Sequence, residues 1–317
     1  MKITVLDSKT LGEDLNLSPL LELGETEIYE NTPPQLVAQR IKDSEVVVIN
    51  KVKLCEGNLS DASSLKLICI AATGYDNIDI EYCKKAGIGV CNVVGYSTDS
   101  VAQLTVAMVL SLACHLSEHT RTVSSGAYTA SGVANSLTPV YHELAGKTWG
   151  VIGYGNIGRH VANVAKALGC NVIANRKSGT NEKECVSLET LCENSDIITI
   201  HTPLNDSTRG LVDSRMISLM KKDVIIVNTA RGAVTDEKAL ADAIKNKKIG
   251  ALGSDVYSVE PFGETHPFYE IKEFPNVCLT PHMAWGAYEA RERCLDEIVK
   301  NITAFYNGEV RSRVDLK

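Results

Sequence analysis

The sequence predicts an α/β protein with a doubly wound parallel sheet and a second, discontinuous parallel domain. Short β-rich runs alternate with helical stretches along most of the 317 residues. Near residue 150, a glycine-rich turn connects an apolar run to an amphipathic helix. A last helix, predicted over Ala287–Asn307, follows the final strand and has no sheet of its own. A chain of this length fits two domains.

The glycine-rich turn has the spacing of a dinucleotide-binding site. A strand predicted over Thr148–Ile152 leads into Gly153, Gly155 and Gly158, and a helix over 159–168 follows. The first glycine allows the tight turn, the second lets the backbone approach a pyrophosphate, and the third lets the helix pack on the strand. The N–H groups that begin the helix face the anion. The next predicted strand, 171–174, completes a βαβ unit. Without this context, the alternative is that the glycines only form ordinary turns.

Residues 1–98 are predicted to form a small parallel α/β domain. Its β-rich runs are Ile3–Leu6, Glu27–Tyr29, Val46–Ile49, Leu67–Ile70 and Gly89–Asn92. Asn50 and Lys51, and the polar loop 71–79, follow two of these runs, at the sheet edge where open α/β sheets bind ligands. Capping side chains at 97–100 precede a helix predicted over Val101–Leu116, where the chain crosses into the second domain.

Residues 99–286 are predicted to form the dinucleotide-binding domain, with at least six strands and helices on both faces. Beyond the glycine unit its strands are Asp196–Ile200, Asp223–Asn228, Ala251–Asp255 and Val277–Leu279. Its later helices are Ser187–Glu193, Ser214–Met220 and Glu237–Asn246. We expect residues 287–317 to return and pack against the first domain.

Composition and charge narrow the range of partners. The formal net charge is −7 and the chain has no basic block, which argues against nucleic acid and favours a small dissolved substrate. No apolar run reaches the ~18 residues that span a bilayer, so no membrane partner is expected. The ten cysteines are scattered without a Cys-x-x-Cys pair, and the N-terminus does not resemble a signal peptide, so we expect a cytoplasmic protein.

One metal-like pattern carries no assignment. The segment His115-Leu-Ser-Glu118-His119 matches a zinc-peptidase motif, and two histidines four residues apart share a helix face. No third ligand can be assigned, and histidines near a helix C-terminus are favoured by the helix dipole. We therefore predict no metal site.

The residues after the second strand of the βαβ unit bear on the cofactor. An acid about 20 residues beyond the glycines usually binds the ribose 2′-hydroxyl. Here the stretch is Asn175-Arg176-Lys177-Ser178, and Arg176 can form bidentate bonds to a 2′-phosphate. This favours NADPH. A solvated basic loop in an NAD-binding protein is the alternative.

Polar groups end three later strands, at the same edge as the glycine turn. They are His201-Thr-Pro-Leu204, Asn228-Thr-Ala-Arg-Gly232 and Leu279 to Trp285. Between the last two lies Glu260, which can reach His282. A carboxylate beside an imidazole raises the pKa of that imidazole and fixes the orientation of its ring. Acid–base catalysis requires both effects. The alternative for His282 alone is a structural role beside the core.

Across nearly its whole length the chain resembles the D-isomer-specific 2-hydroxyacid dehydrogenases, and among them it is most similar to glycerate dehydrogenases, also called hydroxypyruvate reductases. The resemblance is carried by Ala72–Asp79, Gly95–Gln103, Leu144–Thr148, Gly153–Gly158, Asn228–Gly232, Asp255–Pro261 and Thr280–Trp285. It implies a flavodoxin-like substrate domain, a Rossmann domain, a cleft between them, and a homodimer built on the Rossmann domains.

The resemblance also implies roles for individual residues. Arg231 would bind the substrate carboxylate and polarise the carbonyl, His282 would protonate the carbonyl oxygen, and Glu260 would keep His282 protonated. The backbone N–H groups of Thr73 and Gly74 match the loop that holds the carboxylate. The positions that match cofactor-binding residues are Gly153, Tyr154, Gly155, Asn156, Ile157, Gly158, Asn175, Arg176, Lys177, His201, Thr202, Pro203, Thr208, Thr229, Ala230 and Asp255, the last on the nicotinamide amide.

The activity favoured by this resemblance is reduction of hydroxypyruvate or glyoxylate to D-glycerate or glycolate with NAD(P)H. A D-lactate or other D-2-hydroxyacid dehydrogenase is the alternative within the class. Formate dehydrogenases are disfavoured, because they carry Gln where Glu260 stands. A nucleotide-sensing corepressor is a remote alternative, since the chain lacks a long disordered extension.

Overall fold

A computed structural model describes residues 1–176 and 182–316, and its chain forms two compact units. Unit 1 comprises Met1–Ser97 and Trp285–Lys317, and unit 2 comprises Thr98–Ala284. Unit 1 is therefore discontinuous in sequence. Lys177, expected to contact the cofactor, lies outside the described residues.

In the described part of unit 1, five parallel strands have the order β2-β1-β3-β4-β5. The strands are β1 (Lys2–Val5), β2 (Glu25–Ile28), β3 (Val46–Ile49), β4 (Leu67–Ile70) and β5 (Gly89–Cys91). The helices between them include α1 (Ser18–Leu21), α2 (Val37–Ile41), α3 (Glu56–Leu59) and α4 (Ile80–Ala86). This 2-1-3-4-5 order is the flavodoxin-like arrangement.

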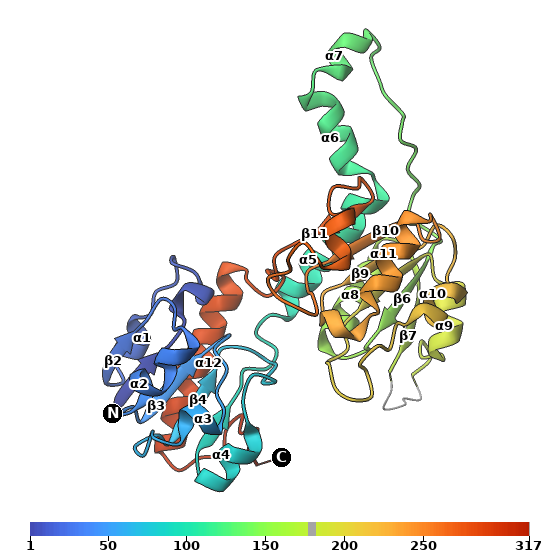
Figure 1. Cartoon of the computed structure of the whole chain (residues 1–317). Coiled ribbons are helices and arrows are strands. Elements are labelled where there is room, and N and C mark those ends of the chain that lie inside the picture. Colours follow the sequence, from blue (N-terminus) through green and yellow to red (C-terminus); the bar gives the residue numbers. More distant parts are fainter. Residues whose placement is uncertain (177–181, 317) are drawn as a thin grey trace. The chain divides into compact units, whose positions relative to one another are not determined.

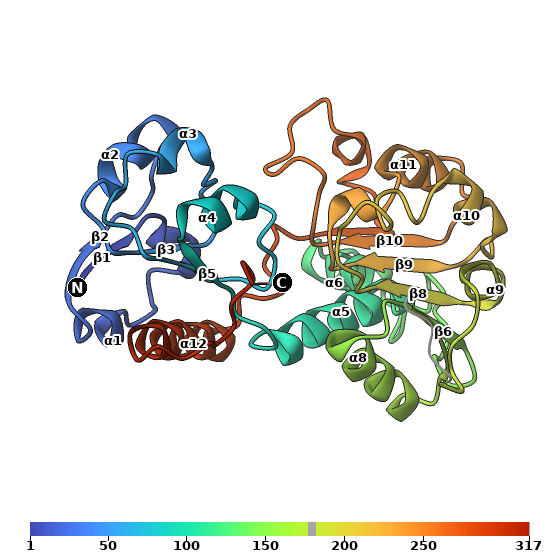
Figure 2. The ribbon, with the colours of Figure 1, turned by 90° about the horizontal axis from the view of Figure 1, so that it is seen from below.

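Both faces of the unit 1 sheet are covered, which explains why β3 and β4 are apolar at every position. On β3, Val46 and Val48 pack in the core that includes α12 (Tyr288–Tyr306), while Val47 and Ile49 pack in the core that includes α2. Figure 2 shows α12 on one face and α2 and α3 on the other. The C-terminal helix thus covers one face of the unit 1 sheet together with α1.

In the described part of unit 2, six parallel strands have the order β11-β10-β9-β8-β6-β7, and Figure 2 shows β10, β9, β8 and β6 side by side. They are β6 (Thr148–Ile152), β7 (Asn171–Asn175), β8 (Ile197–Ile200), β9 (Ile225–Asn228), β10 (Ala251–Ser254) and β11 (Val277–Leu279). An isolated parallel bridge between Ala174 and Cys185 extends the sheet beyond β7. The order reverses at β6, and such a switch point is where doubly wound sheets bind ligands.

Helices cover both faces of this sheet (Figure 2). The core on one face includes α5 (Thr98–Ala113) and α8 (Asn156–Ala167). The core on the other includes α9 (Leu188–Asn194), α10 (Ser214–Leu219) and α11 (Glu237–Lys245). The strands were predicted to within about two residues at each end, the usual uncertainty of element boundaries.

The helix expected over Val101–Leu116 was placed wrongly at both ends. Helix α5 begins at Thr98 and ends at Ala113, and α6 (Leu116–Ser124) continues at an angle of 65°. His115 between them has a left-handed backbone, with φ of 47°. Helix α5 buries apolar residues against the sheet, whereas no residue of α6 is buried. The chain therefore leaves the core at the bend.

Beyond the bend, α6 and α7 (Ala127–Ser131) form an arm that projects from the unit 2 sheet in Figure 1. No single described helix is long and apolar enough to cross a membrane. The bent pair α5 and α6 passes that test by length and composition only.

Candidate active site

The glycine turn after β6 forms as its spacing predicted. Gly153 has φ of 94°, and a Cβ there would lie 2.5 Å from the backbone nitrogen of Thr202. A Cβ on Gly158 would lie 2.2 Å from the carbonyl oxygen of Gly153, whereas a Cβ on Gly155 would meet nothing within 4 Å. The first and third glycines thus allow close packing. The second leaves open space at the start of α8, which fits a pyrophosphate.

Tyr154 in this turn can contribute only its backbone to such a site. Its ring packs in the core beside Val151 and Val161, with the Arg159 guanidinium 4.5 Å from the ring centroid. Burial raises the pKa of the Tyr154 hydroxyl. Arg159 is also paired with Glu182.

The end of β7 lies beside the glycine turn, because the Gly153 N–H donates to the Asn175 carbonyl over 2.9 Å. The Asn175 side chain donates to the Val186 carbonyl over 3.1 Å, so its amide secures the neighbouring segment. Arg176 follows and is exposed. The structure thus brings the expected 2′-phosphate ligand next to the expected pyrophosphate turn.

The end of β8 places a half-buried histidine, His201, behind this turn, with its Nε2 shielded from solvent. Two threonine hydroxyls determine which nitrogen of this ring carries the proton. Thr105 Oγ1 donates its only proton to the Val101 carbonyl over 2.7 Å, so it accepts from Thr229 Oγ1 at 2.9 Å. Thr229 Oγ1 therefore accepts from His201 Nδ1 at 3.4 Å, and His201 Nε2 carries a lone pair. No described group bonds that Nε2. Burial lowers the pKa of His201 to about 3, so the ring is neutral.

Thr208 closes the loop that follows β8. Its hydroxyl donates to the Pro203 carbonyl over 2.6 Å and accepts from the Asn205 N–H at 2.8 Å. Thr208 and Thr202 are both buried. The side chain of Thr208 therefore shapes the loop, and its expected contact with the cofactor stays a prediction.

The turn after β9 presents Arg231. The Asn228 side chain holds this turn from both sides, since it accepts from the Ala230 N–H at 3.0 Å and donates to the Arg231 carbonyl at 3.0 Å. The Arg231 guanidinium donates to the Ala230 carbonyl over 2.8 Å and remains partly exposed. Its fork of N–H donors suits a carboxylate.

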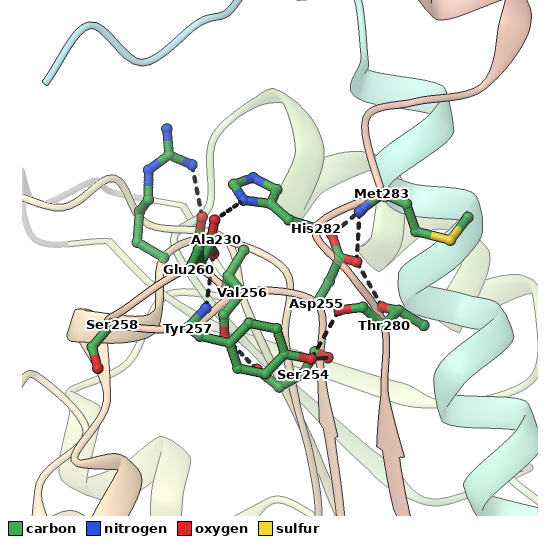
Figure 3. A network of polar contacts seen from close by, with 12 residues as sticks. Ala230, Ser254, Asp255, Val256, Tyr257, Ser258, Glu260, Thr280, His282 and Met283 are labelled. Atoms are coloured by element: carbon green, nitrogen blue, oxygen red, sulfur yellow. Dashed lines mark hydrogen bonds and ion pairs between the residues drawn. The ribbon is translucent and has the colours of Figure 1, made fainter. Parts of the chain in front are cut away.

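The histidine and carboxylate that the sequence singled out are in contact (Figure 3). His282 Nδ1 lies 2.6 Å from Glu260 Oε2, and Glu260 Oε1 accepts from the Tyr257 N–H at 2.9 Å. An ionised carboxylate only accepts, so Nδ1 carries a proton and Nε2 is the nitrogen that can deliver a second one. Both side chains are partly exposed, as proton exchange with a substrate requires.

Asp255 secures the backbone around His282, a role that sequence reasoning missed. Its fully buried carboxylate accepts from the Thr280 hydroxyl at 2.6 Å and from the N–H groups of Met283 and Ala284, each at 2.8 Å (Figure 3). His282 between them has φ of 53°, an uncommon conformation for a residue with a side chain. The expected contact of Asp255 with a nicotinamide amide stays a prediction.

In unit 1, Thr73 and Gly74 follow β4. The Thr73 hydroxyl donates to the Val93 carbonyl over 2.8 Å, and its own carbonyl accepts from the Asn92 side chain at 2.7 Å. The two residues' N–H groups have no acceptor among residues 1–176 and 182–316. Asp7 holds the neighbouring loop after β3 by accepting from the N–H groups of residues 50–52.

Among the described residues, no group of three or more His, Cys, Asp or Glu side chains could hold a metal ion. In the segment that suggested a zinc motif, His115 Nδ1 contacts Glu118 at 2.8 Å. His119 Nε2 contacts the Pro139 carbonyl at 3.1 Å.

Known proteins are similar to this chain in sequence and in fold. The family described as D-isomer specific 2-hydroxyacid dehydrogenase, NAD binding domain, matches residues 106–284. A hydroxypyruvate reductase of Blautia hydrogenotrophica is 34% identical over 317 residues, covering 97% of this chain and 98% of the relative. A glycerate dehydrogenase of Methylorubrum extorquens is 33% identical, covering 99% of each.

Solved structures agree with these relatives. A D-lactate dehydrogenase from Aquifex aeolicus, complexed with NAD and lactic acid, has a TM-score of 0.84 at 32% identity, covering 98% of this chain and 96% of that one. An acyclic imino acid reductase (Bsp5) in complex with NADPH and D-Arg has a TM-score of 0.88 at 29% identity, covering 99% and 100%. The chain belongs to the D-isomer specific 2-hydroxyacid dehydrogenase family, close to its glycerate dehydrogenases.

Proposed function

We propose that the protein reduces hydroxypyruvate or glyoxylate to D-glycerate or glycolate with NAD(P)H. The observation that carries this proposal is the 2.6 Å contact between His282 and Glu260, in the unit whose sheet also carries Arg231 and the glycine turn after its strands. The bound cofactor supplies a hydride to the carbonyl carbon. The names of the hydroxypyruvate reductase and glycerate dehydrogenase relatives support this choice of substrate.

In this proposal His282 donates the proton that the carbonyl oxygen gains. The proton leaves Nε2, and the ring later recovers one from water. Glu260 stabilises the imidazolium form, because an adjacent negative charge favours the positive state. Arg231 binds the substrate carboxylate through paired N–H groups and aligns the carbonyl. The N–H groups of Thr73 and Gly74 are proposed as further ligands of that carboxylate.

We propose NADPH as the preferred cofactor, on the basis of Arg176 beside the glycine turn. A charge-assisted hydrogen bond contributes about 1.5–3 kcal/mol, or roughly ten- to hundredfold in affinity, and exposure reduces it toward the lower value. The preference should appear in KM for the cofactor with kcat little changed. Arg176→Asp should reverse it, because the carboxylate repels the 2′-phosphate.

The test is a panel of 2-oxo acids assayed with NADH and NADPH. Turnover of hydroxypyruvate or glyoxylate, with NADPH favoured over NADH, is the expected result. Pyruvate as the best substrate would favour a D-lactate dehydrogenase, which the Aquifex aeolicus structure supports as the second candidate. Cofactor binding without turnover of any 2-oxo acid would support a nucleotide-sensing module. Equal kcat/KM with both cofactors would remove the role of Arg176.

We also propose that the protein is a homodimer and works in the cytoplasm. The arm formed by α6, α7 and the segment up to residue 146 exposes several large apolar side chains, and exposed apolar patches mark contact surfaces. They are Leu116, Val123, Tyr128, Val133, Leu137, Val140 and Tyr141. All ten cysteines are free thiols, which suits a reducing compartment.

A further inference from the structure

We propose that Glu237 and His266 are positioning residues, which hold segment 257–260 so that Glu260 keeps its contact with His282. The inference rests on the proposed function and deepens it, because neither residue belongs to the groups that function uses. Glu237 begins helix α11, and His266 caps the short helix Pro267–Ile271. Both side chains are buried.

The Glu237 carboxylate binds the segment directly. Its Oε1 accepts from the Ser258 N–H at 2.8 Å, and its Oε2 accepts from the Ser258 hydroxyl and from His266 Nε2 at 3.0 Å. Every one of these contacts brings a donor to the carboxylate, which matches its ionised, acceptor-only form. A buried charge needs such partners, so Glu237 fixes Ser258 firmly.

The hydrogen bonds of His266 also fix its proton. Its Nδ1 accepts from the Phe268 N–H at 3.2 Å, and a backbone N–H can only donate. Nδ1 therefore carries a lone pair, and the proton of the neutral ring lies on Nε2, directed at Glu237. The ring packs against Tyr257, Phe262 and Phe268, with centroids 5.9, 5.0 and 5.3 Å away. Rotation of the ring is blocked on several sides.

Segment 257–260 thus lies between two carboxylates. Glu237 accepts a hydrogen bond from the Ser258 N–H. Glu260 accepts one from the Tyr257 N–H at 2.9 Å and contacts His282 with its other oxygen. Gly232, next to Arg231, lies against the same backbone, since a Cβ there would be 2.3 Å from the Ser258 nitrogen. A shift at Ser258 would therefore move Glu260 and disturb the turn that carries Arg231.

Replacing one acceptor oxygen of Glu237 should loosen the hold on segment 257–260. Glu237→Gln places an amide NH₂ where the Ser258 hydroxyl and His266 Nε2–H both donate, and His266 cannot exchange its proton because Phe268 donates to Nδ1. Two donors then face each other in a buried site, which is costly. We expect Ser258 to move and the Glu260 contact with His282 to lengthen. A misplacement of about 1 Å can cost about 10²-fold in rate.

The test compares the NMR signal of the His282 Nδ1 proton in the cofactor-free protein, with the signal identified by its loss in His282→Gln. Because this proton lies against Glu260, its chemical shift in Glu237→Gln should move toward the position seen in Glu260→Gln. The charged groups in the described network around His282 are Glu260, Arg231 and Asp255, and all are retained in Glu237→Gln. Combining Glu237→Gln with Glu260→Gln should add no further movement, because the first acts through the second.

Activity gives the second measurement. In Glu237→Gln kcat for reduction should fall by about 10-fold or more, with the Kd of the cofactor unchanged. Glu270→Gln, which removes a neighbouring exposed carboxylate paired with Lys245, should change neither. His266→Phe removes the donor and should act like Glu237→Gln, whereas His266→Gln retains an N–H donor and should stay close to the parent.

The outcomes separate the two proposals. A parent that reduces no 2-oxo acid overturns the proposed function, while the NMR comparison still decides the positioning role. A lower melting temperature in Glu237→Gln and His266→Phe with an unchanged signal of the His282 Nδ1 proton would show a purely structural role and overturn the inference. If Glu237→Gln does not fold, the comparison of His266→Phe with His266→Gln decides the same question.

Discussion

At the scale of single residues, the proton donor makes the sharpest prediction. General acid–base groups contribute about 10²–10⁴-fold to rates. His282→Gln should lower kcat for reduction by that factor, measured by cofactor oxidation, while cofactor Kd stays the same. Glu260→Gln should also lower kcat, because an amide offers one acceptor oxygen where the carboxylate offers two, to the Tyr257 N–H and to His282 Nδ1.

A matched control for this prediction is His160→Gln. His160 also contacts a carboxylate, Asp99, at 3.2 Å, but both side chains are well exposed on the surface. Its loss should leave kcat unchanged. Near-normal kcat in His282→Gln would remove that residue from the role of proton donor.

His201 predicts how stability depends on pH. Burial lowers its pKa from 6.5 to about 3 in the folded state. Between these values the unfolded chain binds a proton that the folded chain does not, so stability falls as pH drops from about 6.5 to 3. The slope from this one group approaches about 1.4 kcal/mol per pH unit.

Urea unfolding at a series of pH values measures this slope. His201→Gln should flatten the dependence between pH 6.5 and 3, whatever its effect on absolute stability. His160→Gln, which removes an exposed histidine, should leave the slope unchanged. A slope that is the same in parent and His201→Gln would mean that His201 is not held neutral by burial.

At the scale of elements, the glycine turn separates packing from binding. In Gly158→Ala the methyl group meets the Gly153 carbonyl oxygen, so the turn must shift and the melting temperature should fall, with a loss of about 1–3 kcal/mol. Gly155 has an ordinary φ of −92° and open space around it. Gly155→Ala should therefore keep the parent's stability yet raise the cofactor Kd, because the methyl group occupies the place proposed for the pyrophosphate.

Thermal unfolding and cofactor titration of the two variants make the comparison. Each glycine thus serves as the other's control. Unchanged cofactor affinity in Gly155→Ala would argue that the pyrophosphate binds elsewhere.

The sequence predicted those parts of the site that lie at strand ends. Parallel strands deliver their carboxyl-end residues to one edge, which is why the glycine turn, Arg231 and the contact of Glu260 with His282 could be foreseen. The bend at His115 could not, because the apolar pattern of α5 continues to Leu116 and a left-handed backbone leaves no compositional signal. Glu237 was visible only as the start of a helix.

The carboxylates that support the site escaped prediction for a related reason. Asp255 binds backbone N–H groups 28 and 29 residues away, and His266 lies 29 residues from Glu237. A backbone donor exists at almost every residue, so no pattern marks which one a carboxylate will reach. Such partners become visible only when the fold brings them together.

At the scale of the whole molecule, the exposed apolar side chains of the arm predict a dimer contact. Leu137 and Val140 are 76% and 66% exposed, and in a homodimer we expect a second copy to cover them. Burying such a side chain stabilises an assembly by about 1.5–3 kcal/mol. Leu137→Asp with Val140→Asp should therefore raise the dimer Kd by at least about 10²-fold, since two apolar contacts are lost and two charges enter the interface. Light scattering across a concentration series measures the change. Val310→Asp, at an equally exposed apolar residue of unit 1, is the control and should leave the mass unchanged. A parent that is monomeric at every concentration, or a double variant that dimerises as the parent does, would show that the arm serves another purpose.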